Sequence, residues 1–178
     1  YKPNARFSSN MPLFTQTGST PNDLWLADGS PDFAVFPGGL IDQVPQDVPI
    51  WLKVGTPAYG VAHIAQRHAA WIRKQGKPVY ELVWDKLGQP GKVLTTEAAR
   101  KVKINLHLNP SALLILQLED RSKTVHFSVT SLYLKQGKLD GDELGKYPGR
   151  PKPRLLVGQA YLDSLSVSSE AKPKLPFV

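Results

Sequence analysis

The stretch VKINLHLNPSALLILQLEDRSKTVHFSVTSLYL, residues 102–134, decides the fold. Its first part, up to Leu108, alternates apolar and polar residues, which is the pattern of a strand with one buried face. Residues 112–118 are nearly all apolar, as in a central strand buried on both faces. Residues 124–134 alternate again, and the polar run 119–123 has the length of a hairpin turn. We therefore expect three consecutive antiparallel strands.

Two helices are expected before these strands. Thr56-Pro57 signals a helix start, because threonine caps a helix and proline suits its first position. Apolar residues then recur at helical spacing as far as Ile72, and Gly76 is expected to end this helix. A second, short helix is expected over residues 79–87. The order predicts an α+β fold with N-terminal helices packed on one face of a small antiparallel β-sheet.

The composition excludes several classes of protein. The chain has 178 residues, no cysteine and a net charge of +7. The absence of cysteine excludes a disulfide scaffold, a thiol nucleophile and Cys-ligated metal sites. No apolar run approaches the roughly 18 residues of a transmembrane helix, and the first residues lack the pattern of a signal peptide. The basic charge favours an anionic partner, with nucleic acid the first candidate.

Charge and chain-breaking residues divide the sequence. Residues 1–62 carry three Lys and Arg against five Asp and Glu, and they hold 14 of the 30 Pro and Gly. The basic excess begins at His63. We expect a Pro/Gly-rich extension or arm over 1–47, the folded core over 48–135, and a basic, Pro-containing extension over 136–178. Both extensions are expected to be irregular.

Within the first extension, two apolar runs flank Asp28-Gly29. They are Leu24-Trp25-Leu26 and Phe33-Ala34-Val35-Phe36. Their spacing fits a small hairpin, and it fits equally well an extended arm that lies over the main body.

Two of the four histidines fall in the first expected helix. At 100° per residue, His63 and Arg67 share one face, and His68 falls on the apolar stripe beside Ile64. His68 is therefore a core histidine bonded to a carbonyl or a reactive group beside the sheet, and these alternatives are evenly matched. A metal is not expected, because the two histidines are five residues apart and about 140° apart around a helix.

The sheet offers the other half of a site. His126, Ser128 and Thr130 share one strand face, and Lys103 and His107 share it if the neighbouring strand has a suitable register. Such a face is usually solvated, but these residue types also suit a phosphate. Metal-free RNA cleavage needs a base, an acid and cations, all of which are present. The carboxylates, in contrast, are expected on loops as solubilising charge.

Residues 60–68, Gly-Val-Ala-His-Ile-Ala-Gln-Arg-His, resemble the G-x-x-H-I-x-x-R-H helix of phage- and toxin-associated nucleases in the barnase–EndoU–colicin–RelE-like superfamily. The run 49–54 resembles the strand that leads into that helix. The run 127–133 resembles the family's last strand, in which threonine or serine is followed shortly by tyrosine. The resemblance covers about residues 48–135.

The resemblance implies a barnase-like fold, with a helix on a four-stranded antiparallel sheet, and metal-independent RNA cleavage without a cofactor. It implies these site residues: His63, Arg67 and His68 from the helix, Thr130, Ser131 and Tyr133 from the last strand, and Arg100 or Lys103 as a further cation. Alternation places Thr130 on one face of its strand and Ser131 and Tyr133 on the other, and a β-bulge would reconcile them.

The leading hypothesis is a ribonuclease-type toxin or effector domain that leaves a 2′,3′-cyclic phosphate. His63 or His68 would move the proton, and Arg67 and a lysine would stabilise the phosphate. Thr130 or Ser131 would hold a phosphate oxygen, and Tyr133 would stack on a base. The resemblance implies RNA as substrate and a place as the toxic C-terminal part of a larger protein. The acidic first segment would be the seat of a neutralising partner such as an immunity protein. The absence of cysteine and of a signal peptide favours action in the bacterial cytoplasm, either in the cell that makes the protein or after delivery into a target cell. One alternative is a nucleic-acid-binding module without catalysis. Another is a phage or effector protein–protein interaction domain, which the acidic, proline-rich first segment favours.

Overall fold

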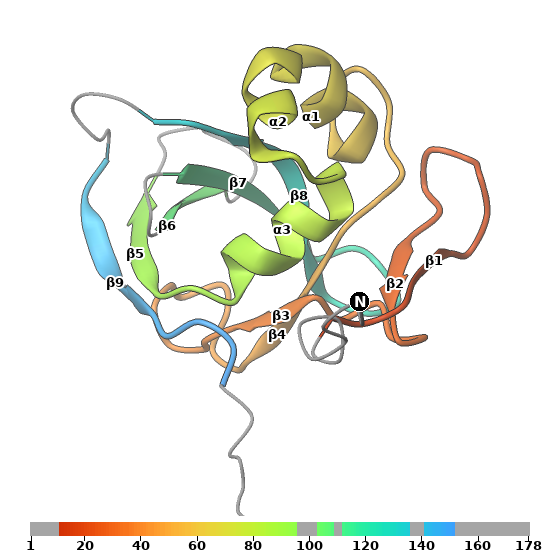
Figure 1. Cartoon of the computed structure of the whole chain (residues 1–178). Helices are drawn as coiled ribbons and strands as arrows, with labels where there is room; N and C mark the ends of the chain where they lie inside the picture. Colours follow the sequence, from red (N-terminus) through yellow and green to blue (C-terminus); the bar gives the residue numbers. More distant parts are fainter. Residues whose placement is uncertain (1–10, 96–102, 109–111, 136–140, 152–178) are drawn as a thin grey trace, which may run out of the picture.

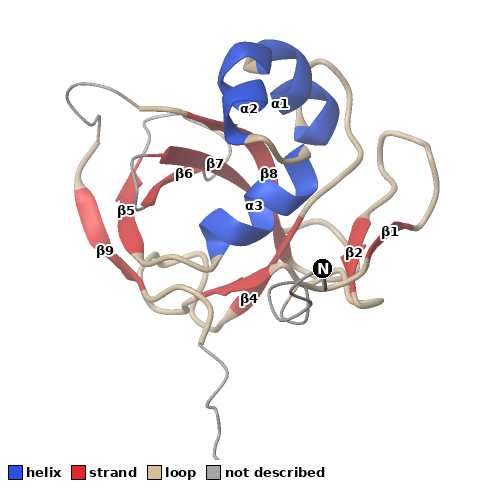
Figure 2. Cartoon of the chain, viewed as in Figure 1, coloured by secondary structure: helices blue, strands red, loops and turns tan. Residues whose placement is uncertain are grey.

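Nine strands and three helices form in the part of the chain that the computed structural model describes, residues 11–95, 103–108, 112–135 and 141–151 (Figures 1 and 2). The helices are α1 (Gly60–Arg67), α2 (Ala69–Gln75) and α3 (Val79–Leu87). The strands are β1 (Phe14–Gln16), β2 (Trp25–Ala27), β3 (Ala34–Phe36), β4 (Val48–Trp51), β5 (Gly91–Thr95), β6 (Lys103–Leu108), β7 (Ala112–Glu119), β8 (His126–Tyr133) and β9 (Glu143–Tyr147).

Seven of the strands form one sheet, in the order β3-β4-β8-β7-β6-β5-β9. Neighbours are antiparallel except β4 and β8, which run parallel. The sheet curls into a half-barrel around α3 (Figure 1). Helices α1 and α2 lie at one open end of this half-barrel, where α1 contacts the inner strand β8. Strands β1 and β2 form a separate antiparallel pair.

The expected fold class is wrong in its architecture. The structure has a large, curled, mixed sheet and three short helices, where we expected N-terminal helices on one face of a small antiparallel sheet. Two of the sheet strands, β3 and β9, come from segments that were expected to be irregular. Both are short, so neither has the alternation that marks a strand in the sequence. Strand β4 overlaps the run 49–54, where the resemblance implied a strand.

The hairpin considered for residues 24–36 does not form. Strand β2 pairs with β1, and β3 pairs with β4. Asp28 and Gly29 do adopt positive φ angles, 49° and 79°, but their turn closes only the Ala27–Ser30 bridge. The aromatic ring of Trp25 stacks on Tyr80 of α3, with centroids 4.0 Å apart, which ties the β1–β2 pair to the helix.

The elements with strong local patterns are confirmed. Strands β6, β7 and β8 pair antiparallel in consecutive order, as the residue 102–134 pattern predicts. Helix α3 spans residues 79–87, as expected. Phe127, Val129 and Leu132 of β8 are fully buried, and they pack in one apolar core with residues from α1, α3 and the other strands of the sheet.

The first helix was expected to begin at Pro57, and it begins at Gly60 instead. Thr56 caps a tight turn, because its hydroxyl accepts a hydrogen bond from the amide of Ala58 at 3.1 Å. The first amides of α1, those of Val61 and Ala62, donate to the carbonyls of Lys53 and Val54. Backbone carbonyls of the segment after β4 thus satisfy the helix N-terminus in place of a capping side chain.

Gly60 allows this close approach. Its φ is +77°, and a Cβ atom there would lie 2.8 Å from the carbonyl oxygen of Lys53. Any other residue would be strained by its backbone angle and would push α1 away from the segment after β4. The glycine therefore sets where α1 starts relative to β4.

No helix in the described ranges is both long and apolar enough to cross a bilayer.

Candidate functional site

A cleft of about 510 Å³ lies over the middle of β8, between the end of β4 and the start of α1. Polar side chains dominate its walls. It is lined by Asn22, Lys53, Ala58, Tyr59, His63, Gln117, Glu119, Ser128, Thr130 and Ser131. Four of the residues expected from the sequence, His63, Ser128, Thr130 and Ser131, therefore meet in one place.

A β-bulge in β8 brings its three hydroxyl residues to this cleft. Ser131 pairs with Ile115 and Val129 pairs with Leu116, so Thr130 is an extra residue in the strand. Its hydroxyl donates to the carbonyl of Ile115 at 3.1 Å. The bulge changes the phase of the alternation, so Ser128, Thr130 and Ser131 all line the cleft. Simple alternation placed Thr130 and Ser131 on opposite faces of the strand, and the bulge brings both to the cleft.

His63 has one fixed ring nitrogen. Its Nδ1 lies 2.7 Å from the carbonyl oxygen of Pro57, in the turn that precedes α1. A carbonyl can only accept, so Nδ1 carries the hydrogen and donates it. The Nε2 atom is then a proton acceptor in the neutral ring and a donor in the charged ring, which is the property that acid–base catalysis requires.

An ion pair crosses β8 on the cleft face. The Nζ atom of Lys53, just after β4, lies 3.9 Å from Oε1 of Glu119 at the end of β7, and the two side chains are 18% and 25% exposed. Trp51 and Gln117 both pair with Ser128, on either side of β8. Lys53 is two residues beyond Trp51, and Glu119 is two residues beyond Gln117. Because β4 is parallel and β7 antiparallel to β8, these two steps go in opposite directions, and the ion pair crosses β8 diagonally at Ser128.

Ser128 is buried beneath this part of the cleft. It is only 4% exposed, and its Oγ has no hydrogen-bond partner among the described residues. A buried hydroxyl without a partner is costly by about 1–3 kcal/mol. Such a group at the floor of a cleft is suited to a hydrogen bond with a bound molecule.

His68 lies at the edge of the cleft, at a break between helices. It ends α1 and precedes α2, with φ −117° and ψ 28°. Its Nε2 lies 3.3 Å from the hydroxyl of Ser131, and its ring stacks on Tyr133 with centroids 5.0 Å apart. Burial lowers the pKa of His68, and the nearby charges of His63 and Arg67 lower that pKa further. The ring is therefore biased toward its neutral form.

The rings of His63 and His68 lie closer together than their separation around a helix suggests. A continuous helix would hold His63 and His68 about 140° apart. In the structure their ring centroids are 6.0 Å apart, and the planes of the two rings are nearly perpendicular, at 89°. No group of three His, Asp or Glu residues able to hold a metal ion occurs within the described ranges.

The remaining expected residues lie outside the cleft lining. Arg67 is exposed in the last turn of α1. His126 is 3% exposed and stacks on Trp51, and burial is the main cause that lowers its pKa. His107 pairs with Leu113 and Lys92, farther along the sheet. Lys103 is paired with Gln117, next to the cleft in register, and Arg100 lies outside the described residues.

Sequence reasoning missed two charged residues of the cleft, Lys53 and Glu119. Glu119 was expected in a polar turn, but it is the last residue of β7. A signal for it did exist: Gln117 and Glu119 are two residues apart in an otherwise apolar strand, which places both on one face. Lys53 stands alone in an apolar run, and no local pattern marks it as functional.

No family model matches the sequence, and no curated protein or solved structure matches the chain. The function is therefore inferred from the chemistry of the cleft.

Proposed function

We propose that this chain is a metal-independent endoribonuclease and that the cleft over β8 is its active site. One observation carries the proposal. His63, with Nδ1 fixed on a carbonyl and Nε2 free to exchange a proton, lines the same small cleft as a carboxylate, Glu119, and an ammonium group, Lys53. These are the base, acid and cation that RNA transesterification needs.

The reaction assigns a role to each group. Ionised Glu119 only accepts, so it takes the proton from the ribose 2′-hydroxyl. The O2′–P bond forms and the P–O5′ bond breaks. Protonated His63 gives the Nε2 proton to the departing O5′ atom. The products are a 2′,3′-cyclic phosphate and a 5′-hydroxyl, and no redox or metal step is needed.

The other cleft residues hold the phosphate. Lys53 offsets the charge that develops on the phosphoryl oxygens, and the Ser128 hydroxyl has a free hydrogen to donate to one of them. Ser131 is held by His68, which makes His68 a positioning residue in this scheme. The Thr130 hydroxyl is engaged by the Ile115 carbonyl, so its role is to fix the bulge.

The wider context follows from the sequence resemblance. A toxin or effector domain of this kind would cut RNA in the bacterial cytoplasm and would have a dedicated inhibitor protein. The same cleft without catalysis would make a nucleic-acid-binding module, and the experiment below separates the two.

The test is cleavage of total RNA and of a tRNA pool in EDTA, with a DNA of matched sequence as a second substrate. We expect the wild type to cut RNA only, with a bell-shaped pH profile and a 2′,3′-cyclic phosphate product. His63→Ala and Glu119→Gln should each lose at least about 100-fold in rate.

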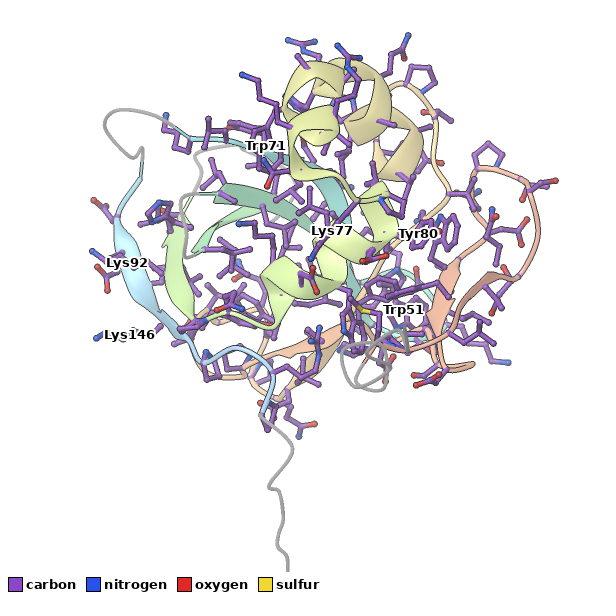
Figure 3. The ribbon with its side chains drawn as sticks, in the orientation of Figure 1. Trp51, Trp71, Lys77, Tyr80, Lys92 and Lys146 are labelled. Atoms are coloured by element: carbon purple, nitrogen blue, oxygen red, sulfur yellow. The ribbon has the colours of Figure 1, made fainter. Side chains whose placement is uncertain are left out.

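The chain supplies matched controls. The pair Lys92–Glu143, at 3.7 Å, resembles Lys53–Glu119 but joins β5 to β9 at the far edge of the sheet, where Figure 3 shows Lys92. Glu143→Gln and His107→Ala should therefore keep full activity. RNA binding without any cleavage would leave the binding module standing, and full activity in His63→Ala would refute the assigned mechanism.

A further inference from the structure

The Trp and Tyr side chains of the described residues fall into two groups. One group belongs to the core or packs against it: Trp25, Trp71, Tyr80, Trp84 and Tyr147. The other three, Trp51, Tyr59 and Tyr133, are half-buried and do not pack against the core. We call these three the aromatic rim. In Figure 3, Trp51 lies beside β4, well apart from Trp71 on α2.

One member of the aromatic rim lines the cleft, and the other two lie next to it. Tyr59 is one of the lining residues. Trp51 pairs with Ser128, which forms the floor. Tyr133 stacks on His68, which contacts Ser131. Aromatic groups that do not contribute to the core are therefore gathered around the proposed active site.

The rings are held in place. The indole nitrogen of Trp51 donates a hydrogen bond to Asp32 at 2.7 Å. The indole stacks on the ring of His126, with the ring centroids 4.1 Å apart and an angle of 22° between the planes. The hydroxyl of Tyr59 donates to Asn22 at 3.1 Å. Because His126 is 3% exposed and Trp51 is more exposed, the imidazole lies on the inner side of the indole. The solvent-accessible part of Trp51 is then its outer side, already oriented for a partner.

The spacing suits a nucleic acid strand. Trp51 is level with Ser128, and Tyr133 is four strand steps farther along β8, because Thr130 is the extra residue of the bulge. At the rise of a strand this is about 13 Å. The cation Lys53 and the proposed acid His63 both line the cleft. A protein that binds single strands combines such cations with rings on which unpaired bases stack.

We propose that the cleft is specific for single-stranded RNA, with unpaired bases stacked on Trp51 and Tyr133 on either side of the phosphate. This inference rests on the proposed ribonuclease function and adds its substrate class. The bases of an A-form duplex are paired and stacked on each other, so they cannot reach the rings.

The test measures binding of a fluorescein-labelled ten-nucleotide RNA, single-stranded or in a blunt duplex, to the His63→Ala protein, so that no RNA is consumed. The single strand should bind more tightly than the duplex. Adding Trp51→Ala or Tyr133→Ala should weaken single-strand binding roughly tenfold each. Trp51→Phe keeps a ring and should stay within about threefold. Val35→Ala, at an exposed residue of β3, should bind as the parent protein does.

Tryptophan fluorescence gives a second measurement on the same proteins. Single-stranded RNA should quench the emission of the His63→Ala protein, and the Trp51→Phe variant should lose most of that quenching, because the other three tryptophans pack against the core. This readout does not depend on the stability of Trp51→Ala, whose fold is checked by thermal unfolding.

The outcomes separate the two proposals. Unchanged single-strand affinity in folded Trp51→Ala, or equal binding of the duplex, would overturn the substrate class while leaving RNA cleavage by the wild type intact. If the wild type neither cuts nor binds RNA, both proposals fall.

Discussion

On one face of β8, Phe127, Val129 and Leu132 are completely buried among apolar side chains. On the other face, His126 and Ser128 are almost as deeply buried, yet His126 Nε2 and Ser128 Oγ have no hydrogen-bond partner in the described residues. Burial on the first face stabilises the fold, at roughly 25 cal/mol per Å² of apolar surface. Burial on the second face works against it.

The difference indicates how one strand serves two purposes. Its apolar face joins the core, where packing is non-directional and every contact stabilises. Its other face holds polar groups, His126 Nε2 and Ser128 Oγ, that the described residues leave without a partner, and under the proposed function a bound phosphate would satisfy Ser128. Substitutions on the two faces should therefore affect different properties, stability on one and binding or catalysis on the other.

The largest effect on stability is expected from Phe127→Ala. Phe127 is fully buried, and its ring lies 4.6 Å from the ring of Phe36. Removing it should lower the free energy of unfolding by about 3–5 kcal/mol, measured by urea denaturation. Val125→Ala is the control, because Val125 is 40% exposed. A loss below about 1 kcal/mol for Phe127→Ala would contradict the assignment of this face to the core.

The next effect tests how α1 is attached to the cleft face. Gly60→Ala places a Cβ atom 2.8 Å from the Lys53 carbonyl at a φ of +77°, whereas Gly76→Ala, at +68°, meets no atom within 4 Å. The Gly76 variant should lose about 1 kcal/mol from its backbone angle alone. The Gly60 variant should lose more, and it should also lose RNA cleavage because α1 carries His63. Equal losses in denaturation experiments would show that the close approach is unimportant.

A smaller effect is expected from pH. Burial holds the pKa of His126 below its ordinary value of 6.5, against the raising effects of the Thr124 hydrogen bond and Glu119, and with a lowering contribution from Lys53. The unfolded chain therefore binds a proton more readily than the folded chain, and stability falls as the pH drops below about 6.5. The pKa of His68 is shifted in the same direction.

His126→Asn keeps an amide donor for the Thr124 carbonyl and removes the titration. Its unfolding free energy should decline less steeply between about pH 7 and pH 5 than that of the wild type. Measurements at pH 8, where the ring is neutral in both states, separate the effect of the substitution itself. Parallel curves for the two proteins over the acidic range would exclude His126 as a source of the pH dependence.

No loss of stability is expected from Ser128→Ala, one residue from Phe127. The change removes a buried hydroxyl that has no partner in the described structure, so the unfolding free energy should rise by up to about 1–3 kcal/mol. RNA cleavage should fall roughly tenfold, because a hydrogen bond to the phosphate is lost. A stability loss above about 2 kcal/mol would mean that Ser128 is structural, and the contrast between the two faces would fail.

The sequence predicted the elements whose residues interact along the chain. Helix α3 and strands β6 and β8 carry an apolar period over six or more residues, which depends on local backbone geometry, and β7 is a nearly continuous apolar run. It also marked four residues that line the cleft, because His63 and the hydroxyls of β8 belong to two conspicuous motifs. Their meeting in one cleft was expected from the resemblance and not from any local pattern.

The tertiary structure decided the rest. Strands β3 and β9 have three and five residues, too few for a clear period, so only their pairing with β4 and β5 defines them. The parallel pairing of β4 with β8 sets Lys53 against Glu119 across the strand, and the bulge at Thr130 depends on the register between β7 and β8. Helix periods and strand alternation are properties of neighbouring residues, which the sequence contains by itself. Register, bulges and ion pairs between strands arise only when distant segments meet, and they determine which side chains form the cleft.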